Sequence, residues 1–185
     1  MYTKKDFVGL AQKYAKREGV DTLLSHLEQS DFYIAPASTK YHDSVRGGLC
    51  HHSVKVMKEL MFEAAGKYPM DTIAVVSLFH DVCKIGYYEE STKNVKDEVT
   101  GQWHKEPFYK VNDLFPMGHG EKSLFMIQDC VKLSTEEALA IRWHMGGYEP
   151  KENYPYISGA YSEYPLALML HLADMRATYL NGEEK

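Results

Sequence analysis

The chain is poor in cysteine. Cys50, Cys83 and Cys130 are odd in number, and no two of them have the Cys-x-x-Cys spacing of a thiolate zinc site or a redox pair. This usage argues against a disulfide framework, which holds together many small secreted domains. We therefore expect three reduced thiols in a cytoplasmic protein.

Long apolar runs and dense basic runs are also missing. The chain has no run of eighteen apolar residues, and residues 1–6 lack the apolar stretch of a signal peptide. We therefore expect a soluble protein with no membrane partner. The net charge of −5 and the scattered Lys and Arg residues argue against binding long duplex nucleic acid. A small nucleotide or a short single strand stays open as a partner, and no feature indicates an oligomeric state.

The composition predicts one helical domain. A length of 185 residues with 44% hydrophobic content supports a single domain over residues 1–185 with a substantial core. Apolar residues recur at helical spacing, which predicts an all-α fold. Helices are expected over 7–15, around 23–27, from Leu49 towards Gly66, from a cap at Asp71 to about Lys84, after Gly120, after the capping box Ser134/Glu137, and from Pro165 onwards.

Two segments depart from helical spacing. Between Gly86 and Gly118, aromatic and β-branched residues alternate with polar ones and are interrupted at Thr100-Gly101. This pattern predicts a β-hairpin or flap inserted into the helical bundle, and its weak core pattern favours a mobile lid. Residues 146–163 are rich in Gly, Pro and Tyr, which predicts a loop before the last helix.

Six side chains that can bind a metal form an ordered series along the predicted helices. His80 and Asp81 end one apolar run and Asp174 follows another, so these polar groups need partners inside the core. Imidazoles and carboxylates from several helices can converge on one cation or on a pair, which keeps the imidazoles unprotonated. A ligand set of nitrogen and oxygen suits Mn, Fe, Co, Ni, Mg or catalytic Zn. The series is His52, His80, Asp81, His119, His144 and Asp174.

Three of the candidate residues have a structural interpretation as well as a functional one. His119, flanked by two glycines, is either a ligand at a helix start or a loop histidine. His144 is either a ligand or a helix C-terminal imidazole stabilised by the helix dipole. Lys84 lies one turn after the His80-Asp81 pair and so faces the same side, where it can bind a phosphate or only compensate the helix end.

The motifs that contain these residues resemble those of the HD-domain family of metal-dependent phosphohydrolases, in particular its short stand-alone members from bacteria and phages. The resemblance covers about residues 30–180. One departure is Cys83, where many members carry glycine or a small apolar residue. The motifs are Gly47-Gly48-Leu49-Cys50-His51-His52-Ser53, Leu78-Phe79-His80-Asp81-Val82-Cys83-Lys84-Ile85-Gly86, Gly118-His119-Gly120-Glu121-Lys122-Ser123, Ile141-Arg142-Trp143-His144 and Leu170-His171-Leu172-Ala173-Asp174.

The resemblance implies a fold, a reaction and roles for individual residues. It implies an HD-domain helical bundle that hydrolyses a phosphoester of a nucleotide or related compound through metal-activated water. Two divalent ions would be held by the six side chains, with His52 favoured over its neighbour by the family's spacing. Asp81 and Lys84 would be catalytic, and Lys84, Lys122 and Arg46 would bind the substrate phosphate.

Alternatives stay open within this family. One ion could be held by His52, His80, Asp81 and Asp174 alone. A minority of HD proteins use the same six ligands for a di-iron site that activates oxygen. Others are non-catalytic nucleotide sensors, although these usually lose part of the ligand set.

Overall fold

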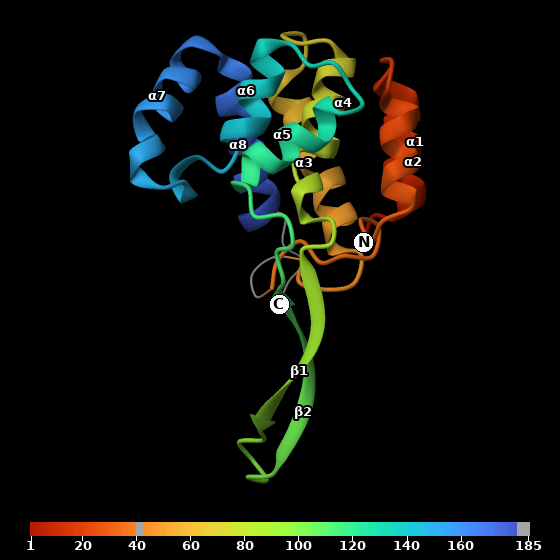
Figure 1. Ribbon diagram of the computed structural model, residues 1–185, viewed down its shortest axis with the longest axis vertical. Helices are drawn as coiled ribbons and strands as arrows, with labels where there is room; N and C mark the ends of the chain where they lie inside the picture. Colours follow the sequence, from red (N-terminus) through yellow and green to blue (C-terminus); the bar gives the residue numbers. More distant parts are fainter. Residues whose placement is uncertain (40–42, 181–185) are drawn as a thin grey trace.

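The computed structural model describes residues 1–39 and 43–180, and in these ranges the chain is mostly helical. Figure 1 shows a body of packed helices with a two-stranded ribbon that projects from one end. The expected helical fold with a small β-hairpin is thereby confirmed. The helices are α1 (Lys4–Tyr14), α2 (Val20–Glu28), α3 (Gly48–Ala64), α4 (Met70–Phe79), α5 (His119–Gln128), α6 (Thr135–Trp143), α7 (Tyr154–Glu163) and α8 (Pro165–Tyr179), with 3-10 turns at Val82–Lys84, Gly146–Tyr148 and Lys151–Asn153.

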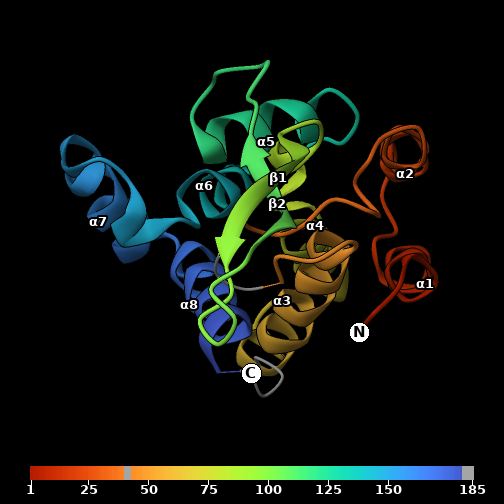
Figure 2. The same cartoon turned by 90° about the horizontal axis from the view of Figure 1, so that it is seen from below.

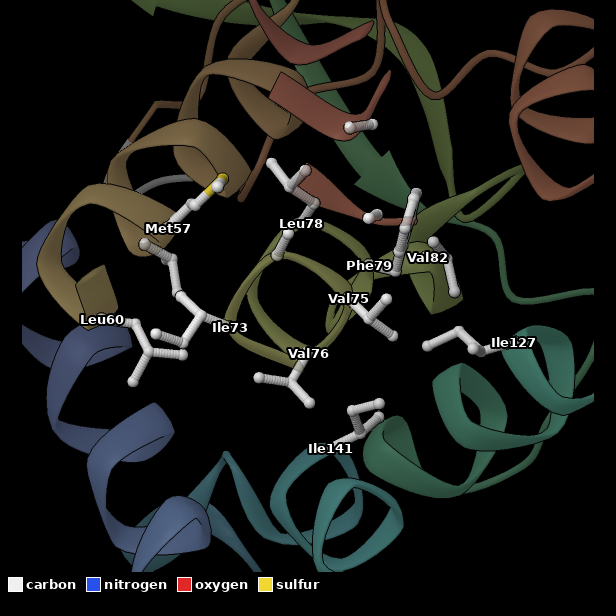
Figure 3. Packing of buried hydrophobic residues seen from close by; sticks show 14 of the residues in the cluster. Met57, Leu60, Ile73, Val75, Val76, Leu78, Phe79, Val82, Ile127 and Ile141 are labelled. Atoms are coloured by element: carbon white, nitrogen blue, oxygen red, sulfur yellow. The ribbon is translucent and has the colours of Figure 1, made fainter. Parts of the chain in front are cut away.

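Helix α4 lies at the centre of the body. Every residue from Ile73 to Phe79 is buried, and a helix that is apolar on all sides must be enclosed by others. In Figure 3 its side chains spread towards Met57 of α3 on one side and towards Ile127 of α5 and Ile141 of α6 on another. The residues that follow Phe79 therefore emerge in the middle of the fold.

The other helices pack around this centre. Helix α3 contacts α4 and α8, α6 contacts α5 and α8, and α1 contacts α3 and α4. Seen from the side of the ribbon, α1 and α2 lie at one flank of the body and α7 lies at the opposite flank (Figure 2). Helices α3, α4, α5, α6 and α8 thus share one region, in which their ends can meet.

No helix in the described part of the chain exceeds 17 residues. The two with the most residues, α3 and α8, have 17 and 15. Within residues 1–39 and 43–180, no helix has both the length and the apolar character needed to cross a bilayer.

A partly buried ionic network joins three segments outside the central core. Arg17 Nη1 and Nη2 each donate to a carboxylate oxygen of Glu137, both at 2.8 Å, and Arg17 Nε donates to Asp71 Oδ2 at 2.9 Å. Thr72 Oγ1 donates to Glu137 Oε1 at 2.8 Å. Glu137 also completes the predicted capping box, since its Oε2 accepts from Ser134 N. The start of α4, the start of α6 and the connection after α1 are held together by these bonds.

Both ends of α4 differ from the sequence prediction, and α5 begins at His119 and not after Gly120. Asp71 does not cap α4, because the helix begins one residue earlier, at Met70, and the Asp71 carboxylate binds Arg17 instead. Helix α4 also ends at Phe79 and not near Lys84. The chain passes through Asp81, at φ −109° and ψ 17°, into a separate 3-10 turn. His80 and Asp81 therefore lie just beyond the helix, where side chains can turn away from the helical register.

The predicted loop over residues 146–163 is wrong in its second half. Residues Tyr154–Glu163 form helix α7, with Pro155 in its first turn, a position that proline suits. Ile157 and Ala160 are buried against Trp143 of α6 and form a small second core cluster with it. The helical spacing of these two residues was the signal, and Pro155 and Gly159 obscured it.

The ribbon is an antiparallel hairpin of β1 (Tyr88–Lys96) and β2 (Trp103–Val111), paired from Tyr88 opposite Val111 to Lys96 opposite Trp103. Its turn contains the predicted interruption at Thr100-Gly101, where Gly101 has a φ of +71°. Most of its residues are exposed, including Trp103 at 68%. The hairpin extends away from the helical body (Figure 1), so in this conformation it does not cover the helices as a lid.

We expect the Glu137→Gln variant to lose about 2 kcal/mol of unfolding free energy at pH 7, because the partly buried Arg17 would lose the buried carboxylate that it binds. Burial raises the pKa of Glu137, but Arg17, Ser134 and Thr72 outweigh this and lower it from 4.5 to about 2. The stabilisation is therefore fully present above pH 4.5 and is lost as the pH falls through about 2. Urea unfolding of both proteins across this range measures it.

The matched control is Glu28→Gln, which removes an exposed pair with Lys4 in which both side chains are about half exposed. Its effect should stay below about 0.5 kcal/mol. Equal effects of the two substitutions, or a Glu137→Gln effect that persists unchanged at pH 2, would show that the Arg17 network does not stabilise the fold.

Backbone amides of β1 and β2 should exchange with solvent much faster than those of α4. An isolated two-stranded hairpin is only marginally stable in water, whereas α4 can open only with the whole core. Hydrogen-exchange mass spectrometry resolves the two regions. Protection of residues 88–111 equal to that of residues 73–79 would indicate that the hairpin is held by contacts beyond those described.

Candidate metal centre

The six predicted ligands lie together in the structure. They come from α3, the segment after α4, the start of α5, the end of α6 and helix α8. His52, His80, Asp81 and His144 are buried, while His119 and Asp174 are partly exposed. Three overlapping groups have ligand atoms within 4.8 Å of one another. These groups are His52/His80/Asp81, His80/His144/Asp174 and Asp81/His119/His144.

The carboxylate of Asp81 lies at the centre of this cluster. Its Oδ2 is 3.9 Å from His52 Nε2 and 3.5 Å from His80 Nε2. Its Oδ1 is 2.7 Å from His119 Nε2 and 3.5 Å from His144 Nε2. Each oxygen therefore faces a different pair of imidazoles.

His80 and His144 are held in the same way at two helix ends. Each follows the last residue of its helix, and each ring Nδ1 lies 2.7 Å from the carbonyl oxygen three residues earlier, Ser77 O or Ile141 O. A carbonyl oxygen can only accept, so Nδ1 carries the proton and the neutral ring has its lone pair on Nε2. Both Nε2 atoms are buried and have no hydrogen-bond partner among the described residues.

Such a pair of buried, unpartnered lone pairs is unfavourable without a ligand. Metal-bound histidines typically donate their second ring N–H to a backbone carbonyl or a carboxylate, which fixes the tautomer and the ring orientation. The rings of His80 and His144, whose centroids are 4.9 Å apart, show this pattern. The donor set therefore fits a divalent cation.

His52 and Asp174 form the other side of the cluster. His52 Nε2 lies 3.0 Å from Asp174 Oδ1, across the contact between α3 and α8. Behind the imidazole, His52 Nδ1 lies 3.9 Å from Asp43 Oδ2, and Lys55 Nζ lies 3.2 Å from the same oxygen. Asp43 was not identified from the sequence, because it lies in an irregular segment with no periodic pattern. His51, the residue before His52, accepts a hydrogen bond from Tyr2 N at its Nδ1. This nitrogen therefore does not face the cluster.

Glycines allow His119 and His144 to approach the centre. A Cβ on Gly120 would lie 2.0 Å from Arg142 O, so this glycine permits the close contact of α5 with α6. Gly146 has a φ of +53°, and a Cβ there would overlap the ring of His171. His171 Nδ1 lies 2.7 Å from His144 O. His171 is thus hydrogen-bonded to the backbone of His144.

The charges of the cluster suit cation binding. Burial lowers the pKa of His80 to about 4, so this imidazole is neutral at neutral pH. Burial alone would raise the pKa of Asp81, but Lys84 and His80 outweigh it and hold that pKa well below its usual value. The pKa of Asp174 is likewise lowered, against burial, by its bond with His52. Two carboxylates are thus anionic beside a neutral imidazole.

His119 differs from the other rings. Burial lowers its pKa, but the contacts with Cys83 and Asp81 outweigh burial and raise the pKa to about 10. Its Nε2 lies 3.5 Å from Cys83 Sγ as well as 2.7 Å from Asp81 Oδ1. A cation bound by this nitrogen would have to displace a proton, so metal and proton compete at His119.

Lys84 and Lys122 adjoin the cluster, and Arg46 does not. Lys84 Nζ donates to Asp81 Oδ2 at 2.6 Å. Burial lowers the pKa of Lys84, but the Asp81 carboxylate outweighs burial and raises it. Both lysines line a cavity beside His119. Arg46 lines a separate cavity at the base of the hairpin, with Glu90 and residues of β2, and none of the six predicted ligands lines it.

The aromatic residues near His144 are already paired with protein groups. The Trp143 ring stacks on the Tyr156 ring at a centroid distance of 6.4 Å. The Arg142 guanidinium lies over the Trp143 ring, 3.6 Å from the ring centroid. The Tyr148 hydroxyl lies 2.8 Å from that of Tyr179. Contacts within the protein thus account for the position of Trp143.

Comparison of the chain with protein-family models, with curated proteins and with solved structures finds no match. The functional argument therefore depends on the geometry of this cluster and on the sequence motifs.

Adding Mn²⁺ to protein stripped of metal should raise the midpoint of thermal unfolding by about 4 °C or more, because an ion bound only by the folded state stabilises it. The Asp81→Asn variant should show no such shift, since the central carboxylate has lost its charge. The exposed His26 of α2 provides a control, and His26→Gln should respond like the wild type. A full Mn²⁺ shift in Asp81→Asn would refute metal binding at this cluster.

Proposed function

We propose that the protein is a metal-dependent phosphohydrolase of the HD-domain type that acts on a nucleotide or a related phosphoester. The observation that carries this proposal is the position of the Asp81 carboxylate, whose two oxygens face two different pairs of imidazoles. This position of the carboxylate supports the binding of two divalent ions. His52, His80 and Asp174 would hold one, His119 and His144 would hold the other, and Asp81 would bridge them.

The ions would supply Lewis acidity and a water of lowered pKa, which is the chemistry that phosphoester hydrolysis at neutral pH requires. The chain's own residues contribute orientation and charge. Ser77 O and Ile141 O fix the tautomers of His80 and His144, so that both rings present a lone pair to the same place. Burial of these rings also keeps bulk water away from the reacting groups.

Lys84 is suited to stabilise negative charge on a phosphoryl group. An ammonium has three donors, and Asp81 is the acceptor described for one of them. The Lys84 side chain also lines the cavity beside His119, so its ammonium is close both to the metal-binding carboxylate and to a space open to a ligand. Positive groups placed where charge develops in the transition state account for a large share of catalysis in such reactions.

We expect metal-loaded protein to release phosphate from at least one member of a panel of nucleoside mono-, di- and cyclic phosphates. Lys84→Met should lower kcat/KM about 100-fold while metal content is retained, because a cation beside the phosphoryl group is lost and no ligand is removed. His119→Ala and His144→Ala should each halve the metal content and abolish hydrolysis. Elemental analysis and a phosphate-release assay measure the two quantities.

Lys110→Met is the control for the loss of a lysine, since Lys110 pairs with Glu89 on the exposed hairpin. Its activity should equal that of the wild type. Full metal content and activity within a few-fold of wild type in both histidine variants would reject the two-ion site. Oxygen consumption by the iron-loaded protein, with no phosphate release across the panel, would favour the oxygenase chemistry of this family.

A further inference from the structure

The cavity beside His119 is lined by two lysines, the partly buried Lys84 and the buried Lys122. Its volume is about 60 Å³, and Lys84, Tyr87, Asp113, Met117 and Lys122 contribute to its lining together with His119. Cavities that enclose a whole drug-sized ligand usually measure roughly 300–1,000 Å³. This space instead suits one small charged group of a larger molecule, with the remainder of that molecule outside.

Lys122 is fixed in position although it is charged. The residue is 4% exposed and belongs to α5, and its Nζ lies 5.4 Å from the centroid of the Tyr87 ring and 5.5 Å from that of the Phe115 ring. A buried ammonium needs a counter-charge. Its described anionic partner is Asp113, with a distance of 2.9 Å from Lys122 Nζ to Asp113 Oδ1.

Asp113 comes from a less firmly held part of the chain. It lies between the end of β2 and the start of α5, in residues 112–118, where no helix or strand is formed and most residues are exposed. The same oxygen, Oδ1, also accepts a hydrogen bond from Phe115 N at 3.0 Å. Asp113 can therefore leave Lys122 and still keep a local partner, whereas Lys122 cannot easily move into water.

We propose that this cavity is a binding subsite for the phosphate group of a ligand, and that this phosphate replaces Asp113 as the partner of Lys122. Asp113 acts as a built-in competitor that balances the charge of Lys122 while the subsite holds no phosphate. A phosphate monoester outcompetes it because it carries up to two charges and three acceptor oxygens, and can bind Lys84 and Lys122 together. The identity of this phosphate as a substrate group rests on the proposed function.

The test measures the binding of inorganic phosphate by isothermal titration calorimetry to the metal-loaded protein. Asp113→Asn removes the competing charge and keeps an oxygen that can accept from Phe115 N. We expect this variant to bind phosphate about fivefold more tightly than the wild type. Lys122→Met should bind about tenfold more weakly, and Lys122→Arg should restore most of the affinity, because it keeps the cation. The double variant Asp113→Asn/Lys122→Met should bind like Lys122→Met alone, since Asp113 has no effect without Lys122.

Asp97→Asn is the matched control, because it removes one negative charge from the hairpin turn, where the Asp97 carboxylate accepts hydrogen bonds from Val99 N and Thr100 N. Its phosphate affinity should equal that of the wild type. Unchanged affinity in Asp113→Asn, or the same gain in Asp97→Asn, would overturn the subsite. Tighter phosphate binding by Asp113→Asn in a protein without hydrolytic activity would support the subsite and count against the proposed function. Hydrolytic activity together with no effect of Asp113→Asn on phosphate affinity would support the proposed function and overturn the subsite.

Discussion

Burial of the Asp81 carboxylate constrains more of this structure than any other single feature. The residue is 2% exposed, and its two oxygens face four imidazoles and the ammonium of Lys84. Removing a carboxylate from water costs several kcal/mol, by an order-of-magnitude estimate, unless charges and hydrogen bonds compensate it. The compensating groups come from α3, α5, α6 and the segment after α4, so these elements must meet at one point. The same contacts with Asp81 therefore hold these elements together and form the candidate metal centre.

Two helix ends have the same design. A helix leaves its last carbonyl groups without amide partners, and here imidazoles from the C-cap residues His80 and His144 take up Ser77 O and Ile141 O. Each ring thus stabilises a helix end with one nitrogen and offers the other to the centre. Because α4 is enclosed by apolar contacts on all sides, the position of His80 is determined by the core and not by the site alone.

The sequence was sufficient to predict most helices and the six clustered side chains, and the reasons are local. Apolar spacing marked α3 and α8, the Ser134/Glu137 pair marked the start of α6, and Thr100-Gly101 marked the hairpin turn. The end of α4 and the whole of α7 were missed, because they depend on contacts with distant segments. Asp43 and Asp113 were missed for the same reason. The contact of each with a lysine exists only after irregular segments are brought against α3 and α5.

The central claim is that Asp81 lies between two cations. Crystals grown with Mn²⁺ and measured at wavelengths on both sides of the manganese absorption edge test it directly. The account predicts two anomalous peaks, one beside Asp81 Oδ2 near His52 and His80, and one beside Asp81 Oδ1 near His119 and His144. A single peak that contacts neither His119 nor His144 would contradict the two-ion centre. The absence of any peak at Asp81 would contradict the metal centre as a whole.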